Sequence, residues 1–296
     1  MSRKITFAFM LLFCCIFGIS AQTEIPKGTS VLKGYEIKIS SQIPYQKLYL
    51  VGYYGAHSYC LDSVALKKNS ATFKSKNVIP RGVYAICDSP NNRPIVQIIL
   101  NKESSFSIQL NETKNDDGTP FRSVTTSGSE ENQLFLDFLA KTPIKDMPNR
   151  CNELLETMPD AFLAKYLMAA YGSNLNNLSD NEILFDCLKN TDLTDTRILY
   201  TPLQIFSLMS RPLEKEELQI TDSVISYMTR ILARKMSPAI QNHIIKELFS
   251  KLDTHNPDYD PALIYLYDNY DKGWIAEGSE TRFKRKIDNL RKIVPG

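Results

Sequence analysis

The chain has 296 residues, of which 23% are charged, with 35 lysines and arginines against 33 aspartates and glutamates. Because the charges nearly balance, the chain has no strong net positive field. The composition therefore does not predict a nucleic-acid or anionic-membrane partner. The length exceeds what one small hydrophobic core usually accommodates, so two domains are expected.

The first 21 residues have the three parts of a secretory signal peptide. Arg3 and Lys4 give a basic start, an apolar run ends at Ile19, and Ser20 precedes the expected cleavage point after Ala21. The apolar run is shorter than the roughly 20 residues that span a bilayer, so cleavage is expected rather than a retained anchor. The sequence therefore predicts a periplasmic protein that keeps no transmembrane anchor, with 33 basic and 33 acidic residues left.

Residues 28–127 are predicted to form an antiparallel β-sandwich. Seven segments carry strand-like patterns, many of them alternating apolar and polar residues, and they recur about every 8 to 15 residues. Pro80, Gly82, Pro90 and Pro94 lie between them, where turn residues are expected. The predicted strands cover residues 31–40, 47–55, 59–66, 71–77, 82–89, 95–101 and 105–110. The KNDDGT segment that follows, with Asp116, Asp117 and Gly118, is expected to be an exposed loop rather than a calcium site.

Residues 128–296 are predicted to form an all-α domain, because the apolar period changes near Gly128 from that of strands to that of helices. Ser127 and Glu130 have the spacing of a capping box at the start of the first helix. Similar caps, or a proline at the first helical position, mark the later helices. These are expected within residues 148–158, 162–171, 179–188, 224–231, 237–252, 260–270 and 279–290. Ser179 with Glu182, Ser237 with Pro238, and Ser279 are predicted to begin three of them, and Gly273 is expected to follow the helix at 260–270. The apolar stripes expected to face inward are Cys151, Leu154, Leu155 and Met158; Leu184, Cys187 and Leu188; Val224, Tyr227, Met228 and Ile231; and Ile240, Ile244, Leu248 and Leu252.

The most apolar stretch of this half is TDTRILYTPLQIFSLMSRPL, residues 194–213. Thr201, Pro202 and Gln204 have capping-box spacing with a proline at the first helical position, so a helix is predicted to begin at this corner. The side chains that follow are expected to be among the most buried of the helical domain: Leu203, Ile205, Phe206 and Leu208.

Four cysteines remain after signal cleavage, and they lack the spacing of a zinc site or a redox CxxC motif. In an oxidising compartment they allow three disulfide pairings. Buried reduced thiols, which behave as small apolar side chains, are the favoured alternative. These cysteines are Cys60, Cys87, Cys151 and Cys187.

No catalytic, cofactor-binding or metal-binding residue is predicted. His57 lies three residues before Cys60, but a metal site needs a third and usually a fourth ligand, and the chain has only three histidines. Asp258 and Asp260 suggest paired carboxylates, yet Asp260 also suits a helix cap before Pro261. Structural roles are favoured for these residues and for the remaining candidates: His243, His255, Tyr259, Tyr265, Tyr267 and Tyr270.

The last predicted helix, residues 280–293, is strongly basic outside a narrow apolar seam of Phe283, Ile287 and Leu290. We expect it to be the least firmly held helix and a docking surface for an acidic partner or a second copy of the chain. A solvated amphipathic face is the alternative. Its basic residues are Arg282, Lys284, Arg285, Lys286, Arg291 and Lys292.

Two regions together resemble known domains of unknown function. The first carries a DS motif (Asp62, Ser63), a strand with Phe73, a Gly-Tyr strand (Gly82, Tyr84) and a GS.EN motif (Gly128, Ser129, Glu131, Asn132). It resembles the β-sandwich domain that precedes thioredoxin-like domains in envelope proteins of Bacteroidetes-type bacteria. The second, from about Asn149 to Val294, resembles the helical domain that follows in those proteins, notably in ILYTPLQ, in Trp274 and in the basic last helix.

The resemblance implies kinship with the N-terminal region of thioredoxin-like thiol-disulfide oxidoreductases. The chain ends at RKIVPG, about where the relatives enter their CxxC domain, so no catalytic residue is carried over. We therefore expect a non-catalytic periplasmic accessory protein whose partner is a thioredoxin-like protein or another envelope protein. The alternatives are a truncated oxidoreductase that lacks its CxxC domain, and a carbohydrate- or peptide-binding module argued from fold analogy alone. The sequence does not specify the oligomeric state.

Overall fold

The structure is a computed structural model that describes residues 25–90, 93–114, 120–171, Phe185, and residues 187–203, 205–214, 221–253, 257–270 and 280–293. By its internal contacts the chain divides into two compact units, Met1–Ala140 and Lys141–Gly296. Within the described ranges, no helix combines the length and the apolar character needed to cross a membrane. Several predictions concern residues outside these ranges: the signal peptide (1–21), Asp116 to Gly118, Ser179, Glu182, Leu184, Gln204, His255, Gly273, Trp274 and Ser279.

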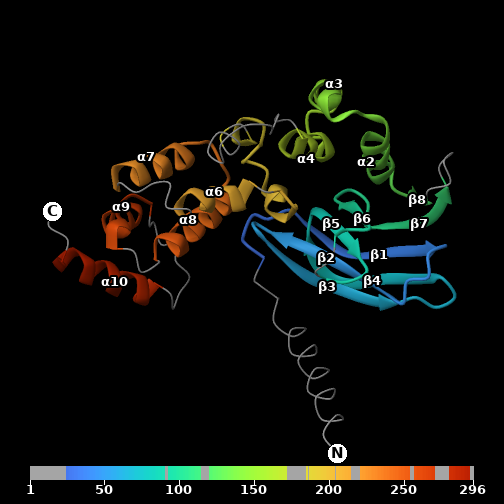
Figure 1. The fold of residues 1–296 in the computed structure, drawn as a ribbon, viewed down its shortest axis with the longest axis horizontal. Coiled ribbons are helices and arrows are strands. Elements are labelled where there is room, and N and C mark those ends of the chain that lie inside the picture. Colours follow the sequence, from blue (N-terminus) through green and yellow to red (C-terminus); the bar gives the residue numbers. More distant parts are fainter. Residues whose placement is uncertain are drawn as a thin grey trace, which may run out of the picture. The chain divides into compact units, whose positions relative to one another are not determined.

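Eight described strands form two four-stranded sheets, with strand orders β4-β1-β7-β8 and β3-β2-β5-β6 (Figure 1). All seven predicted strands are present, and β8 is an eighth that the sequence analysis missed. The strands are β1 Val31–Ser41, β2 Lys47–Tyr54, β3 His57–Ala65, β4 Ser70–Pro80, β5 Gly82–Cys87, β6 Val96–Leu100, β7 Ser105–Lys114 and β8 Pro120–Ser127.

The described strand pairs are antiparallel except for β1 and β7, which run parallel from the Glu36–Ser105 pair to the Ser41–Leu110 pair. The prediction of a purely antiparallel arrangement is therefore wrong at this pair. Side-chain alternation reports which face of a strand is buried, and it carries no information about the direction of the neighbouring strand.

One hydrophobic core takes side chains from both sheets, including Ile37 and Ile39 of β1 and Leu48 and Leu50 of β2. These residues alternate with polar or exposed ones, as expected for strands with one buried face. Strand β5 differs because all six of its residues are buried. Its continuous apolar sequence GVYAIC follows from burial on both faces.

A β-bulge in β1 turns Tyr35 toward this core. The register with β4 shifts between Lys33 and Tyr35, so Leu32 and Tyr35 are both buried although three positions separate them. The residue that allows this is Gly34, whose φ angle is +86°. A Cβ atom on Gly34 would lie 2.5 Å from the backbone oxygen of Ser75. Glycine is therefore required here both by the left-handed backbone and by the close approach of β4.

Replacing Gly34 with alanine is expected to lower the free energy of unfolding by about 2 to 3 kcal/mol, because the strain of a positive φ adds to the clash with Ser75. Gly28→Ala is the matched control, since Gly28 has a φ of +88° but no heavy atom within 4 Å of its added Cβ. The control should lose only about 1 kcal/mol. Urea unfolding monitored by circular dichroism measures both values, and equal losses would show that β4 moves aside at no cost.

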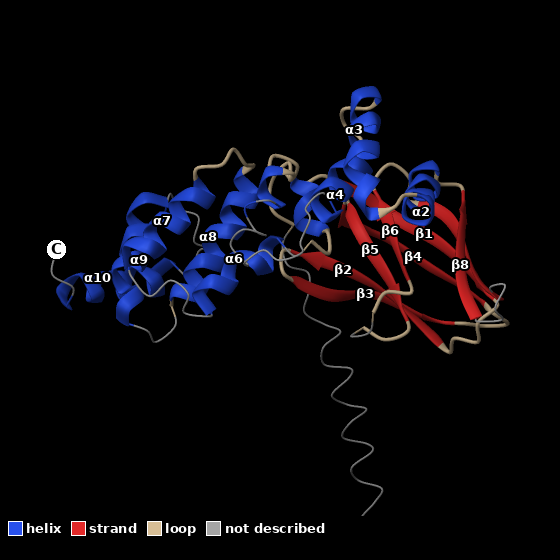
Figure 2. Cartoon of the chain, turned by 45° about the horizontal axis from the view of Figure 1, so that its top comes forward, coloured by secondary structure: helices blue, strands red, loops and turns tan. Residues whose placement is uncertain are grey.

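Eight α-helices are described, and Figure 2 shows them in blue. Helix α4 covers the range predicted for it, and α8 begins after Ser237, whose hydroxyl accepts from the Ile240 amide at 3.4 Å, as predicted. The helices are α2 Glu130–Lys141, α3 Met147–Thr157, α4 Phe162–Tyr171, α6 Ile205–Glu214, α7 Thr221–Leu232, α8 Pro238–Leu252, α9 Asp260–Tyr270 and α10 Glu280–Ile293. The predicted inner faces of α7 and α8 are confirmed as buried: Val224, Tyr227, Met228, Ile231, Ile240, Ile244, Leu248 and Leu252.

The predicted helix start at Thr201 is wrong. Thr201 ends a short 3-10 helix, Thr196–Tyr200, and its hydroxyl donates to the Ile198 carbonyl oxygen at 2.7 Å. Helix α6 begins only at Ile205. Met158 also departs from its predicted place on the inner face of α3, because it follows the helix and is 44% exposed. The burial predicted for the next apolar residues is confirmed for Leu203, Ile205, Phe206 and Leu208.

Among the side chains that the structure describes, the buried Ile287 and two ion pairs tie helix α10 to its own unit. Ile287 is buried, whereas Leu290 is partly exposed and Ile293 is 77% exposed. Lys286 pairs with Asp253 and Arg291 pairs with Asp268. Two of the basic residues proposed for docking therefore serve contacts within the helical unit, and the idea of a docking surface on α10 stays a prediction.

Candidate functional site

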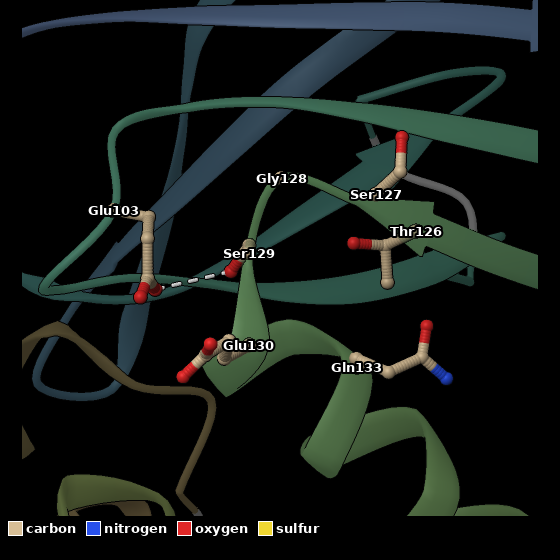
Figure 3. A pocket seen from close by; sticks show the side chains of 7 residues that line it. All are labelled: Glu103, Thr126, Ser127, Gly128, Ser129, Glu130 and Gln133. Atoms are coloured by element: carbon tan, nitrogen blue, oxygen red, sulfur yellow. Dashed lines mark hydrogen bonds between the residues drawn. The ribbon is translucent and has the colours of Figure 1, made fainter.

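An open hollow of about 550 Å³ lies where β8 ends and α2 begins (Figure 3). All of its lining belongs to the first compact unit. The lining combines hydroxyl, carboxylate and amide groups, and its described residues include no cationic or aromatic side chain. The lining residues are Glu103, Thr126, Ser127, Gly128, Ser129, Glu130 and Gln133.

Ser129 organises this junction. The chain turns at Gly128, whose φ angle is +83°. The Ser129 hydroxyl then accepts from the backbone amide of Asn132 at 3.2 Å and from its side-chain amide at 2.9 Å, and donates to Glu103 at 3.1 Å (Figure 3). Ser129 is thus the residue that caps α2. The prediction that Ser127 caps this helix is wrong, because Ser127 is the last residue of β8 and pairs with Ser107.

Asn132 closes the free edge of β6. Its Oδ1 accepts from the Ile99 amide at 2.7 Å, and its Nδ2 donates to the Ile99 carbonyl oxygen at 2.8 Å. The Asn132 side chain is 1% exposed. A side-chain amide that offers one acceptor and one donor in this way imitates the peptide group of a neighbouring strand. Helix α2 therefore covers β6, as proteins often cover exposed strand edges.

Glu131 fastens the same helix to the loop after β6. Its carboxylate accepts from the Asn101 side-chain amide at 3.0 and 3.2 Å. Burial raises the pKa of Glu131 above its usual range, and the nearby Glu103 carboxylate adds to this, while the bonds from Asn101 and Lys102 oppose it. The GS.EN residues of the sequence motif thus form a connected set of hydrogen bonds between α2 and the β6–β7 loop.

The raised pKa of Glu131 predicts a sign for the pH dependence. The folded chain holds this proton more tightly than the unfolded chain, so ionisation as the pH rises above about 4.5 lowers the stability. Glu131→Gln keeps an acceptor for Asn101 and removes the charge. We expect the variant to melt at or above the parental temperature at pH 7, with a difference that shrinks as the pH falls toward 4. If the melting temperature of the parent rose relative to that of the variant as the pH increased, this sign would be contradicted.

The DS motif links the two sheets. Asp62, on the edge strand β3, accepts from the Tyr35 hydroxyl of β1 at 3.1 Å and from the Ser63 amide at 2.7 Å. Burial, followed by the charge of Asp62, raises the pKa of Tyr35. This tyrosine therefore stays a neutral donor at physiological pH. The role of Asp62 is to pair a buried hydroxyl between the sheets.

All four described cysteines are reduced. Cys87, Cys151 and Cys187 are buried, as favoured from the sequence, whereas Cys60 is exposed. Burial raises the pKa of Cys87 and of Cys151 to about 11. Loss of hydration, followed by the charge of Asp62, also raises the pKa of Cys60.

The other candidate residues that lie in the described ranges do not gather into a site. His243 is buried in α8 with its ring 5.1 Å from that of Phe206, and the Tyr259 hydroxyl donates to the Leu213 carbonyl oxygen at 3.4 Å. Tyr265 lies 3.2 Å from the Thr229 hydroxyl. In the described part of the chain, no three His, Cys, Asp or Glu side chains are placed to hold a metal ion.

No family model matches the chain, and no curated protein matches it either.

The residues at the junction of β8 and α2 were visible in the sequence as the GS.EN motif, but their roles were not. Spacing along the chain could not reveal that Asn132 and Glu131 bind β6 and its loop, about 30 residues earlier.

Proposed function

We propose that this protein is a non-catalytic accessory protein of the bacterial cell envelope, exported to the periplasm. It consists of a β-sandwich domain followed by an all-α domain, and it is related to the N-terminal region of thioredoxin-like thiol-disulfide oxidoreductases. Its role is to bind and position another envelope protein, with a thioredoxin-like protein as the first candidate.

The chemistry of the thiols carries the non-catalytic part of this proposal. Thiol-disulfide exchange needs an accessible thiolate, which catalysts obtain by lowering a cysteine pKa. Here the pKa values of Cys60, Cys87 and Cys151 are shifted in the opposite direction. At neutral pH these thiols stay protonated, and two of the three are also buried.

The hydrogen bonds of the motif residues support a scaffold role. Asp62, Ser129, Glu131 and Asn132 direct their polar groups at other parts of the same unit. The residues that carry the family resemblance therefore stabilise the fold. This is expected of a domain that serves different proteins as a structural scaffold.

The mature chain is expected to show no insulin-reducing turnover, because the raised pKa values of Cys60, Cys87 and Cys151 keep these thiols protonated at assay pH. The assay compares the chain alone, a thioredoxin-like protein alone and the two together. Binding of the two proteins, with a changed KM of the thioredoxin-like protein for its substrate, is the result expected for an accessory protein. Turnover by the chain alone that disappears on mutation of one cysteine would overturn the non-catalytic assignment. Absence of binding would exclude the thioredoxin-like protein as the partner.

A further inference from the structure

The four edges of the two sheets differ in how they are protected against pairing with another strand. The β6 edge is closed by the Asn132 side chain. The β3 edge has a bulge between its pairs with Leu50 and Val51, and it turns the charged Asp62 toward Tyr35 between the sheets. The β4 edge presents the exposed Lys74 and Lys76 and ends at Pro80. Bulges, inward charges, edge lysines and prolines are the recognised devices against edge pairing.

Strand β8 lacks these devices over its C-terminal part. It pairs only with β7 in the described part of the chain, so its other edge is the end of its sheet. Its residues 123–127 read SVTTS, without a charge or a proline, and Thr125 and Ser127 are exposed. β-branched residues in an extended, uncharged edge favour the addition of a further strand.

The acidic hollow lies at the C-terminal end of β8. Glu103 and Glu130 line it together with Thr126 of β8, and none of the lining side chains that the structure describes is cationic (Figure 3). The Thr126 Oγ1 atom is buried and has no hydrogen-bond partner. In Figure 3 this hydroxyl points toward the side of the hollow where Ser129 and Glu103 lie. A buried polar atom without a partner is uncommon and indicates a group that a bound molecule can satisfy.

We propose that β8 binds an extended peptide segment as a fifth strand of its sheet, with a lysine or arginine of that segment in the acidic hollow. Cross-strand neighbours project to the same face of a sheet. The peptide residue opposite Thr126 therefore projects toward the hollow, where its cation meets Glu103 and Glu130 and lies within reach of the Thr126 hydroxyl. Backbone hydrogen bonds supply the affinity and the cation sets the register, as in other cases of strand addition.

This inference rests on the proposed interaction role and names the chemistry of the partner. The test is a selection of phage-displayed random dodecapeptides on the purified mature chain, residues 22–296. Enriched peptides should share one lysine or arginine flanked by β-branched residues. A synthetic peptide of this kind should slow amide hydrogen exchange in residues 121–127 at least tenfold. The peptide with that cation replaced by glutamine should bind at least tenfold more weakly.

The double variant Glu103→Gln/Glu130→Gln should lose at least tenfold in affinity for the cationic peptide, while its affinity for the glutamine peptide stays unchanged. Asp88→Asn, at an exposed acidic residue outside the hollow, is the matched control and should bind as the parent does. The proposal is overturned by any of four results: no enriched peptide, protection confined to other strands, equal affinity in the double variant, or a dimer of the chain itself that occupies β8. Each of these leaves the insulin assay and the search for a thioredoxin-like partner unaffected.

Discussion

Replacing Asn132 with leucine is expected to lower the free energy of unfolding by about 3 to 5 kcal/mol. Leucine has a similar size, but it leaves the amide and the carbonyl oxygen of Ile99 without partners at a buried strand edge. Each buried polar group left unsatisfied costs about 1 to 3 kcal/mol. Ser129 also loses the side-chain amide that donates to its hydroxyl.

Chemical unfolding of the purified chain measures this loss. Gln133→Leu is the matched control, because Gln133 is the next residue of α2 and is exposed, so it should change the stability by less than about 0.5 kcal/mol. Asn132→Asp separates the two bonds: it keeps an acceptor for the Ile99 amide but faces the Ile99 carbonyl oxygen with a second oxygen. Equal unfolding midpoints for Asn132→Leu and Gln133→Leu would show that the β6 edge is satisfied in another way.

Replacing Phe206 with alanine is expected to lower the free energy of unfolding of the helical unit by about 3 to 5 kcal/mol. Phe206 is among the largest side chains in the protein that are almost completely buried, and its ring packs edge-on against His243 of α8. Removing the ring deletes apolar contacts and opens a cavity between α6 and α8, two helices that pack on each other.

Phe206→Leu provides the comparison, since it keeps most of the buried volume and should lose clearly less than the alanine variant. Thermal unfolding followed by circular dichroism at 222 nm reports mainly on helices and so suits this unit. An alanine variant that melts at the parental temperature would mean that the site collapses without loss of stability, and the expected contribution of Phe206 would then be wrong.

Strands were predictable wherever one face of the strand enters the core. The segments around Ile37 and Ile108 alternate clearly, because each second residue is buried. Strand β8 was not predicted because the apolar alternation in its sequence PFRSVTTS is weak. Among its described side chains, Val124 packs against the core and is partly buried. Such a strand is defined by its hydrogen bonds to β7, and a pattern of apolar residues does not report these.

The errors at helix starts have a shared physical cause. Ser127 and Thr201 both precede a suitable residue three positions later. However, Ser127 is the last residue of β8, and Thr201 caps the end of a 3-10 helix through its hydroxyl. A capping pattern is local, whereas the choice between two possible caps depends on where the preceding strand or turn ends. Ser129, and not Ser127, caps α2 because β8 continues to Ser127 and the chain turns only at Gly128.

The hydrogen bonds from Asn132 to Ile99 also decide where this protein can be divided. The change from strand to helix near Gly128 invites a cut at residue 127, yet such a fragment would leave β6 with bare amide and carbonyl groups along an apolar strand. Strands of this kind join edge to edge and precipitate. A fragment that continues through Lys141 keeps its own cover for that edge. Soluble expression of the N-terminal half thus depends on the twelve residues of α2, which belong, by secondary structure, to the helical part.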